Sequence, residues 1–147
     1  MALAGTLKGK TVFIDTAPLI YFIEKHPAYL NVLKPVFTSI NAGRIKGLTS
    51  TITLLEVLVH PLRMGNEKLA RLYREILLDS QGMISYEITH AITEKAAHLR
   101  AKYSFKTPDA IQLAACSVHQ ADFFLTNDSD LKKAEGITVL VLDDYVK

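Results

Sequence analysis

Short apolar runs alternate along the chain with longer segments of helical periodicity. The short runs, rich in β-branched and aromatic residues, are residues 11–14, 45–49, 83–88, 123–126 and 138–142. Helices between successive strands act as crossovers, so we expect these strands to run parallel with helices on both faces. Most residues of these runs are apolar, as strands buried on both sides require. We therefore predict an α/β fold, a three-layer α/β/α sandwich with a five-stranded parallel sheet.

The length fits one domain. The chain has 147 residues, of which 49% are hydrophobic and 22% charged, so intrinsic disorder is excluded. We expect a single domain over residues 1–147 in which residues 1–9 form a loose tail. No stretch approaches the roughly 18 apolar residues of a membrane span, and residues 1–10 lack the apolar run of a signal peptide. The single cysteine, Cys116, cannot form an internal disulfide, which fits a cytoplasmic location.

Prolines and capping residues mark the expected helix boundaries. Pro35 lies inside a helical pattern, which predicts a kink or a split helix. The helix that Ser50 or Thr51 caps should stop before Pro61. Another helix should begin at Asn66, with Leu72 among the residues of its apolar face.

Carboxylates follow the expected strands, at the sheet edge where ligands bind in open α/β folds. Asp15 directly follows the first strand, and Asp128 comes two residues after the fourth. Asp109 lies in the first turn of a helix, and Glu56 lies within the run 52–59, in which Thr53 is the only other polar residue. Helix capping or turn formation could explain Asp15 and Asp128, and the helix dipole could explain Asp109. A carboxylate among apolar residues is costly unless it is paired or binds a metal, so Glu56 is harder to explain structurally.

Together the four positions predict a cation site. Clustered carboxylates repel one another, so at neutral pH they need cations or raised pKa values. Ligand sets made only of oxygen favour Mg²⁺ or Mn²⁺ over zinc, and such ions promote phosphodiester chemistry. The five histidines lack metal-like spacing, and no glycine-rich phosphate loop is present.

The segments around these acids resemble the four signature motifs of PIN-domain ribonucleases. They are Phe13-Ile14-Asp15-Thr16, residues 49–56, Thr107-Pro108-Asp109-Ala110 and residues 125–130, in the expected order. The chain is most similar to single-domain VapC-type toxins of type II toxin–antitoxin pairs, from about residue 10 to residue 145. The resemblance implies an endoribonuclease that depends on Mg²⁺ or Mn²⁺, cleaves RNA and is inhibited by a small antitoxin.

The resemblance also implies roles for individual residues. The catalytic and metal-binding residues would be the acidic quartet of Asp15, Glu56, Asp109 and Asp128. Thr126 and Thr16 would support it as neighbouring hydroxyl groups. Asp130 would act mainly as a helix cap or an outer ligand, and Gln112 would bear on substrate contacts.

Charge and hydrophobicity suggest partners. Residues 1–74 hold 10 Lys/Arg and 4 Asp/Glu, a net of +6, whereas residues 75–147 hold 7 and 11, a net of −4. The basic clusters within residues 63–74 and 95–106 are either solvated faces or contacts for RNA phosphates. The apolar stretch 19–40 exceeds the needs of one core, which predicts a groove for the antitoxin or for a second copy in a homodimer.

Two other functions compete with the nuclease. One is a non-catalytic PIN-fold module that binds RNA or protein, against which the complete acidic quartet argues. The other is a receiver-like phosphoryl-transfer domain, which needs a lysine near the end of the fifth strand. The only lysine beyond Lys133 is Lys147, so the receiver function is disfavoured.

Overall fold

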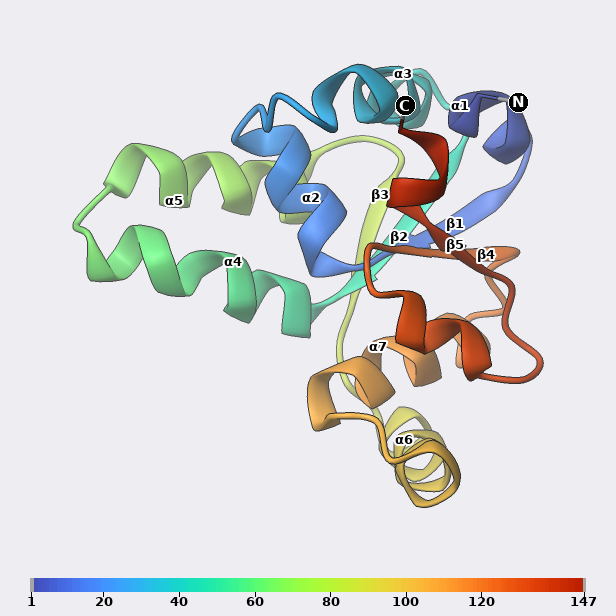
Figure 1. Ribbon diagram of the computed structural model, residues 1–147. Helices are drawn as coiled ribbons and strands as arrows, with labels where there is room; N and C mark the ends of the chain where they lie inside the picture. The colour runs from blue at the N-terminus through green and yellow to red at the C-terminus, as the bar shows by residue number, and fades with distance from the viewer. Residues whose placement is uncertain (1, 147) are drawn as a thin grey trace.

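The computed structural model describes residues 2–146 and contains one parallel sheet (Figure 1). Its strands are β1 (Thr11–Ile14), β2 (Lys46–Ser50), β3 (Met83–Tyr86), β4 (Phe123–Thr126) and β5 (Val139–Val141). They are ordered β3-β2-β1-β4-β5, and every neighbouring pair is parallel. The sheet therefore confirms the predicted fold class. The strand order reverses at β1, and in such sheets the crevice beyond that point is where ligands bind.

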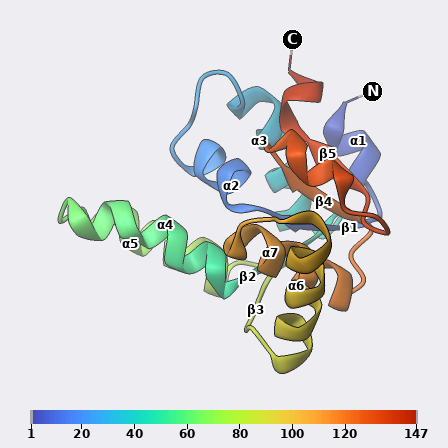
Figure 2. The ribbon, with the colours of Figure 1, turned by 60° about the horizontal axis from the view of Figure 1, so that its bottom comes forward.

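Helices cover both faces of the sheet (Figures 1 and 2). One face carries α1 (Leu3–Leu7), α2 (Thr16–Ile23), α3 (Leu30–Asn41) and the π-helical turn η1 (Glu75–Asp79). The other carries α6 (His90–Tyr103) and α7 (Thr107–Val118). Helices α4 (Thr51–Arg63) and α5 (Glu67–Arg74) form a hairpin that projects beyond the sheet. Short 3₁₀ helices, η2 (Ser129–Lys133) and η3 (Leu142–Tyr145), follow β4 and β5.

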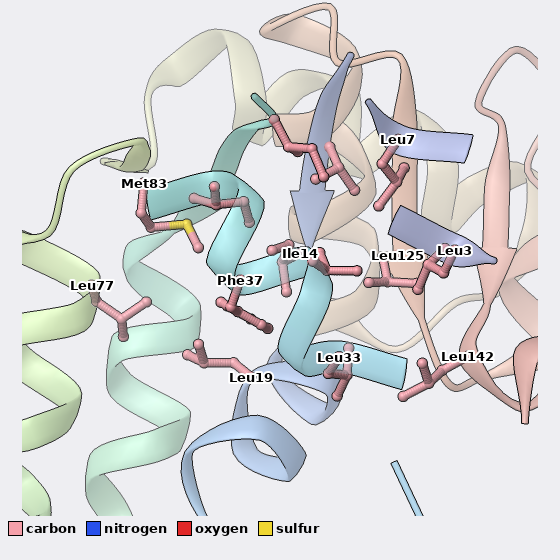
Figure 3. Close-up of a cluster of buried hydrophobic side chains, with 14 of the residues drawn as sticks. Leu3, Leu7, Ile14, Leu19, Leu33, Phe37, Leu77, Met83, Leu125 and Leu142 are labelled. Atoms are coloured by element: carbon pink, nitrogen blue, oxygen red, sulfur yellow. The ribbon is translucent and has the colours of Figure 1, made fainter. Parts of the chain in front are cut away.

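Alternate side chains of the central strands build two separate hydrophobic cores. Ile14 and Leu125 face α1–α3, where Figure 3 shows them among leucines from several helices. Phe13 and Phe124 face α6 and α7, and their rings stack with centroids 5.6 Å apart. Burial of both faces stabilises the sheet without help from the charged edge. In the described residues 2–146, no helix is both long and apolar enough to span a bilayer.

The expectation of a loose tail at residues 1–9 is wrong for the described part of that segment. Residues Leu3–Leu7 form α1, in which Leu3 is 2% exposed and Leu7 is fully buried. The two leucines are four residues apart, so they lie on the same face of the helix and enter the first core together. A five-residue helix is too short to produce a recognisable period, which is why the sequence pattern missed it.

Four other local expectations have mixed outcomes. Helix α3 is not split at Pro35, and α4 continues through Pro61 to Arg63. Pro61 is buried near the last turn, where few helical hydrogen bonds remain to be lost. Asn66 caps α5 as predicted, since its side chain accepts a hydrogen bond from the Leu69 amide at 3.1 Å. Leu72, expected on the apolar face of α5, is 40% exposed because that helix projects from the body.

The packing of α1 predicts the outcome of a single truncation. Leu7→Ala should lower the free energy of unfolding by about 2–4 kcal/mol, because it leaves a cavity in the first core. Urea denaturation followed by circular dichroism measures this change. Lys8→Ala, at the neighbouring exposed position, should stay within about 0.5 kcal/mol of the wild type. Equal stability of Leu7→Ala and the wild type would show that the helix does not dock.

Candidate active site

Asp15 lies at the end of the central strand, where β1 passes into α2. Its backbone amide donates to the Leu125 carbonyl at 2.9 Å and so extends the pairing of β1 with β4 by one residue. One side-chain oxygen accepts from the Thr16 amide at 2.9 Å, which caps α2. The other accepts from Thr126 Oγ1 at 2.8 Å. The capping role considered from sequence is therefore real, and it fixes the orientation of the carboxylate at the sheet edge.

The surroundings of Asp15 disfavour its negative charge. Burial raises the pKa of Asp15, and the charge of Glu56 raises it further. Hydrogen bonds from Thr126 and the Thr16 amide act in the opposite direction, but the pKa stays above its ordinary value. A carboxylate held in this way is stabilised by a proton or by a nearby cation.

Glu56 reaches the site from α4, and its environment differs from the sequence-based expectation. Thr16 Oγ1 donates to Glu56 Oε1 at 2.6 Å, which joins α4 to the first turn of α2. Glu56 is nevertheless exposed, because the outer face of α4 is open to solvent. The apolar residues around Glu56 indicated that this part of the helix is buried, and the prediction that Glu56 is buried is wrong. Its position beside Thr16, rather than a cost of burial, is what links Glu56 to the site.

Asp109 shows that the four acids of the quartet share one electrostatic environment. It lies half-buried in the first turn of α7. Burial raises its pKa to about 6, and the charges of Asp15, Asp128 and Glu56 add to the effect, opposed by Lys106. The charges of the other three acids therefore act on Asp109, although burial is the larger cause of its raised pKa. In the part of the chain that the structure describes, no group of three or more Asp, Glu, His or Cys side chains is placed so that it could hold a metal ion.

Asp128 and Asp130 occupy the turn after β4. Asp128 is exposed and caps η2 by accepting from the Asp130 amide at 3.0 Å, while its own amide donates to Thr126 Oγ1 at 3.2 Å. Thr126 thus links Asp15 to the loop that carries Asp128. The side chain of Asp130 instead forms an exposed ion pair with Lys133 at 3.1 Å. Asp128, not Asp130, is the helix cap.

Gln112 was misjudged from the sequence. It was expected to contact substrate, but it is 1% exposed and bonds to Ser50 and Thr53 at the start of α4. Ser50 caps α4 as predicted, by accepting from the Ile52 amide at 3.2 Å. A usable signal was present: Gln112 lies three residues after Asp109, on the same face of a helix that is otherwise apolar there.

The chemistry of these donors fits a divalent cation. The site offers carboxylate oxygens and the hydroxyls of Thr16 and Thr126, with no histidine or cysteine among them. Mg²⁺ and Mn²⁺ prefer such oxygen ligands, whereas zinc prefers nitrogen and sulfur. A bound dication would also relieve the mutual repulsion that raises the pKa of Asp109.

Comparison with known proteins gives a consistent result. The sequence matches the PIN domain family over residues 12–137. Similar solved structures include a toxin-antitoxin complex from Klebsiella pneumoniae, with 23% identity and a TM-score of 0.66 over 89% of this chain and 97% of that chain. DNA-bound VapBC from Salmonella typhimurium has 14% identity and a TM-score of 0.72, and the match covers 90% of this chain and 98% of that chain. The sarcin-ricin loop cleaving toxin VapC20 from Mycobacterium tuberculosis has 18% identity and a TM-score of 0.63, and the match covers 77% of this chain and 86% of that chain. No curated protein matches the sequence.

The pKa of Asp109 predicts how stability depends on pH without divalent ions. That pKa is about 6 in the folded chain against an ordinary value of 3.8, so between these values the folded state binds more protons. The free energy of unfolding should therefore fall as pH rises through this window. Asp109→Asn cannot ionise, so in EDTA at pH 7 its Tm should exceed that of the wild type by about 2–4 °C.

Thermal melts from pH 4 to pH 7.5 test this expectation. Asp79→Asn, which removes an exposed acid outside the quartet, should retain the wild-type pH dependence. If Asp109→Asn kept the full wild-type pH dependence, the raised pKa of Asp109 would be refuted.

Proposed function

The chain belongs to the PIN domain family, and from this premise we propose that it is a metal-dependent endoribonuclease, the toxin of a type II toxin–antitoxin system. The observation that carries the proposal is the set of hydroxyl contacts that links three of the acids at the sheet edge. Thr126 Oγ1 donates to Asp15 and accepts from the Asp128 amide, and Thr16 Oγ1 donates to Glu56. Neighbours with this fold support it, since one is described as a toxin that cleaves the sarcin-ricin loop. Such an enzyme would act on RNA in the cytoplasm, where Cys116 would stay reduced.

The acidic quartet would hold Mg²⁺ or Mn²⁺. When bound, such an ion supplies an activated water and neutralises charge that develops on the scissile phosphate. The chain's own residues keep the carboxylates in place: Thr126 and the Thr16 amide orient Asp15, and the Thr16 hydroxyl orients Glu56. Asp130, paired with Lys133, would contribute a negative charge at the rim of the site.

Cations close to the quartet would bind the RNA backbone. Lys106 immediately precedes α7, and its charge lowers the pKa of Asp109. An exposed lysine in this position can contact a phosphate next to the scissile bond. Phosphate contacts of this kind position the RNA without selecting its sequence.

The surface that fits an antitoxin lies on the projecting hairpin. Residues 19–40 were expected to form the partner groove, but Leu19, Leu33 and Phe37 of that stretch are buried in the first core. Large exposed apolar side chains instead gather on α4 and the turn after it, including Leu55 at 61% and Met64 at 66%. We propose that a small antitoxin covers this surface, and that the toxin is a homodimer. One neighbour of the same fold is a toxin-antitoxin complex from Klebsiella pneumoniae.

The nuclease proposal predicts the loss of activity in one variant. Asp15→Asn should cleave labelled RNA at least ~100-fold more slowly than the wild type in Mg²⁺ or Mn²⁺, because it removes the central carboxylate. Gel assays with and without EDTA measure the rate, and Asp79→Asn serves as the exposed-acid control. Undiminished cleavage by Asp15→Asn would refute the proposal. A wild type that binds RNA or protein without cleaving it would instead be the non-catalytic module.

The antitoxin proposal predicts a separate effect. Leu55→Ser with Leu62→Ser should abolish complex formation with the product of the adjacent reading frame, because both side chains are exposed on α4. Pull-down and sedimentation velocity report the complex, and sedimentation of the toxin alone reports the homodimer. Val118→Ser, at an exposed apolar position on α7, is the control and should bind normally. Unchanged binding by the double variant would place the antitoxin on another surface.

A further inference from the structure

A group of fully buried polar side chains lies beneath the acidic quartet. In residues 2–146, the polar side chains classed as buried are Thr49, Ser50, Thr53, Gln112 and Thr126. Thr126 bonds to Asp15 directly, and the other four are joined to one another by hydrogen bonds. Among residues 2–146, these five Ser, Thr and Gln side chains thus form a buried polar layer that supports the candidate site.

Gln112 is the member of this group that connects two helices. Its Nε2 donates to Thr53 Oγ1 at 2.6 Å, and its Oε1 accepts from Ser50 Oγ, so both ends of the amide are occupied. Thr53 Oγ1 lies 2.8 Å from Thr49 Oγ1, which donates to the Ile14 carbonyl at 2.9 Å. A continuous line of hydrogen bonds therefore runs from α7 through the start of α4 to the last residue of β1.

Each end of this line lies next to an acid of the quartet. Gln112 is three residues after Asp109 on α7, and Thr53 is three residues before Glu56 on α4, so each pair shares a helix face. Ile14 immediately precedes Asp15. The Gln112 amide also bears on Asp15 itself, whose pKa it lowers. Displacing Gln112 would change how three of the four acids are placed relative to one another.

Stability alone gives no reason for such a network. Replacing both partners of a buried hydrogen bond by apolar groups of the same shape can be nearly neutral or stabilising. Gln112 has buried apolar neighbours on its own helix, so an apolar residue would suit this core. What an apolar residue cannot provide is a directional bond that fixes the angle between α7 and α4.

We propose that Gln112 is a positioning residue, which through Thr53 and Ser50 holds Asp109, Glu56 and Asp15 in the arrangement that binds the divalent ion. This inference rests on the proposed metal-dependent function. It assigns Gln112 no contact with RNA, in contrast to the role expected from the sequence. Groups that orient metal ligands commonly change metal affinity by about 10–100-fold when they are removed.

The test compares metal affinity with stability in one pair of variants. Gln112→Met keeps the length of the side chain and removes its hydrogen bonds. Leu113→Met changes the next residue, which is buried and apolar. Mn²⁺ binding is followed by electron paramagnetic resonance of free Mn²⁺, and Tm is measured in EDTA. Gln112→Met should bind Mn²⁺ at least ~10-fold more weakly, whereas Leu113→Met should match the wild type.

A double-mutant cycle with Thr53→Val tests the connection. Thr53→Val should weaken Mn²⁺ binding as Gln112→Met does, and the two changes together should cost less than their sum. If Gln112→Met does not fold, the Mn²⁺ affinity of Thr53→Val alone tests the positioning role. Wild-type Mn²⁺ affinity in the folded variants, with only a lower Tm, would mean a merely structural role and overturn the inference. A wild type that binds no Mn²⁺ would overturn the proposed function as well.

Discussion

Repulsion between carboxylates at one edge of the sheet is the constraint to which the rest of the site responds. A parallel sheet brings the carboxyl ends of its strands to the same edge, and here Asp15 and Asp128 follow neighbouring strands. Glu56 and Asp109 arrive there on helices that begin at that edge. The pKa values of Asp15 and Asp109 are raised by burial first and by the neighbouring carboxylates second. Two apolar cores, one on each face of the sheet, stabilise the fold independently and offset the unfavourable free energy of these carboxylates.

The acids are oriented by hydroxyl groups rather than by cations. Thr126 donates to Asp15, and Thr16 donates to Glu56. The ion pairs found among residues 2–146 join Lys102 to Glu135, Lys132 to Asp144 and Lys133 to Asp130, all outside the quartet. A hydroxyl donor fixes the direction of a carboxylate without cancelling its charge. The site therefore keeps its negative charge available for a mobile cation, which an internal ion pair would have displaced.

Features that depend on a local residue pattern could be predicted from the sequence. Features that depend on contacts between residues far apart in the chain could not. The alternation of short apolar runs with helical segments predicted the parallel sheet, and the positions of Asp15 and Asp128 just after expected strands predicted acids at one edge. The roles of Gln112 and Thr53 depend on a contact between residues 59 positions apart, which no local pattern contains. The burial of Glu56 was misjudged because apolar residues in a projecting helix look like those of a core helix.

Helix α4 joins the two halves of the proposed function. Its first turn belongs to the buried network around Thr53, and its outer face presents exposed apolar side chains. Leu55 immediately precedes Glu56, and Val59 follows it by three residues, so a carboxylate of the quartet lies within the apolar surface. An antitoxin that covers Leu55 and Val59 would therefore also approach Glu56. The same contact would then both bind the antitoxin and inhibit the active site. No separate inhibitory contact with the ion would be required.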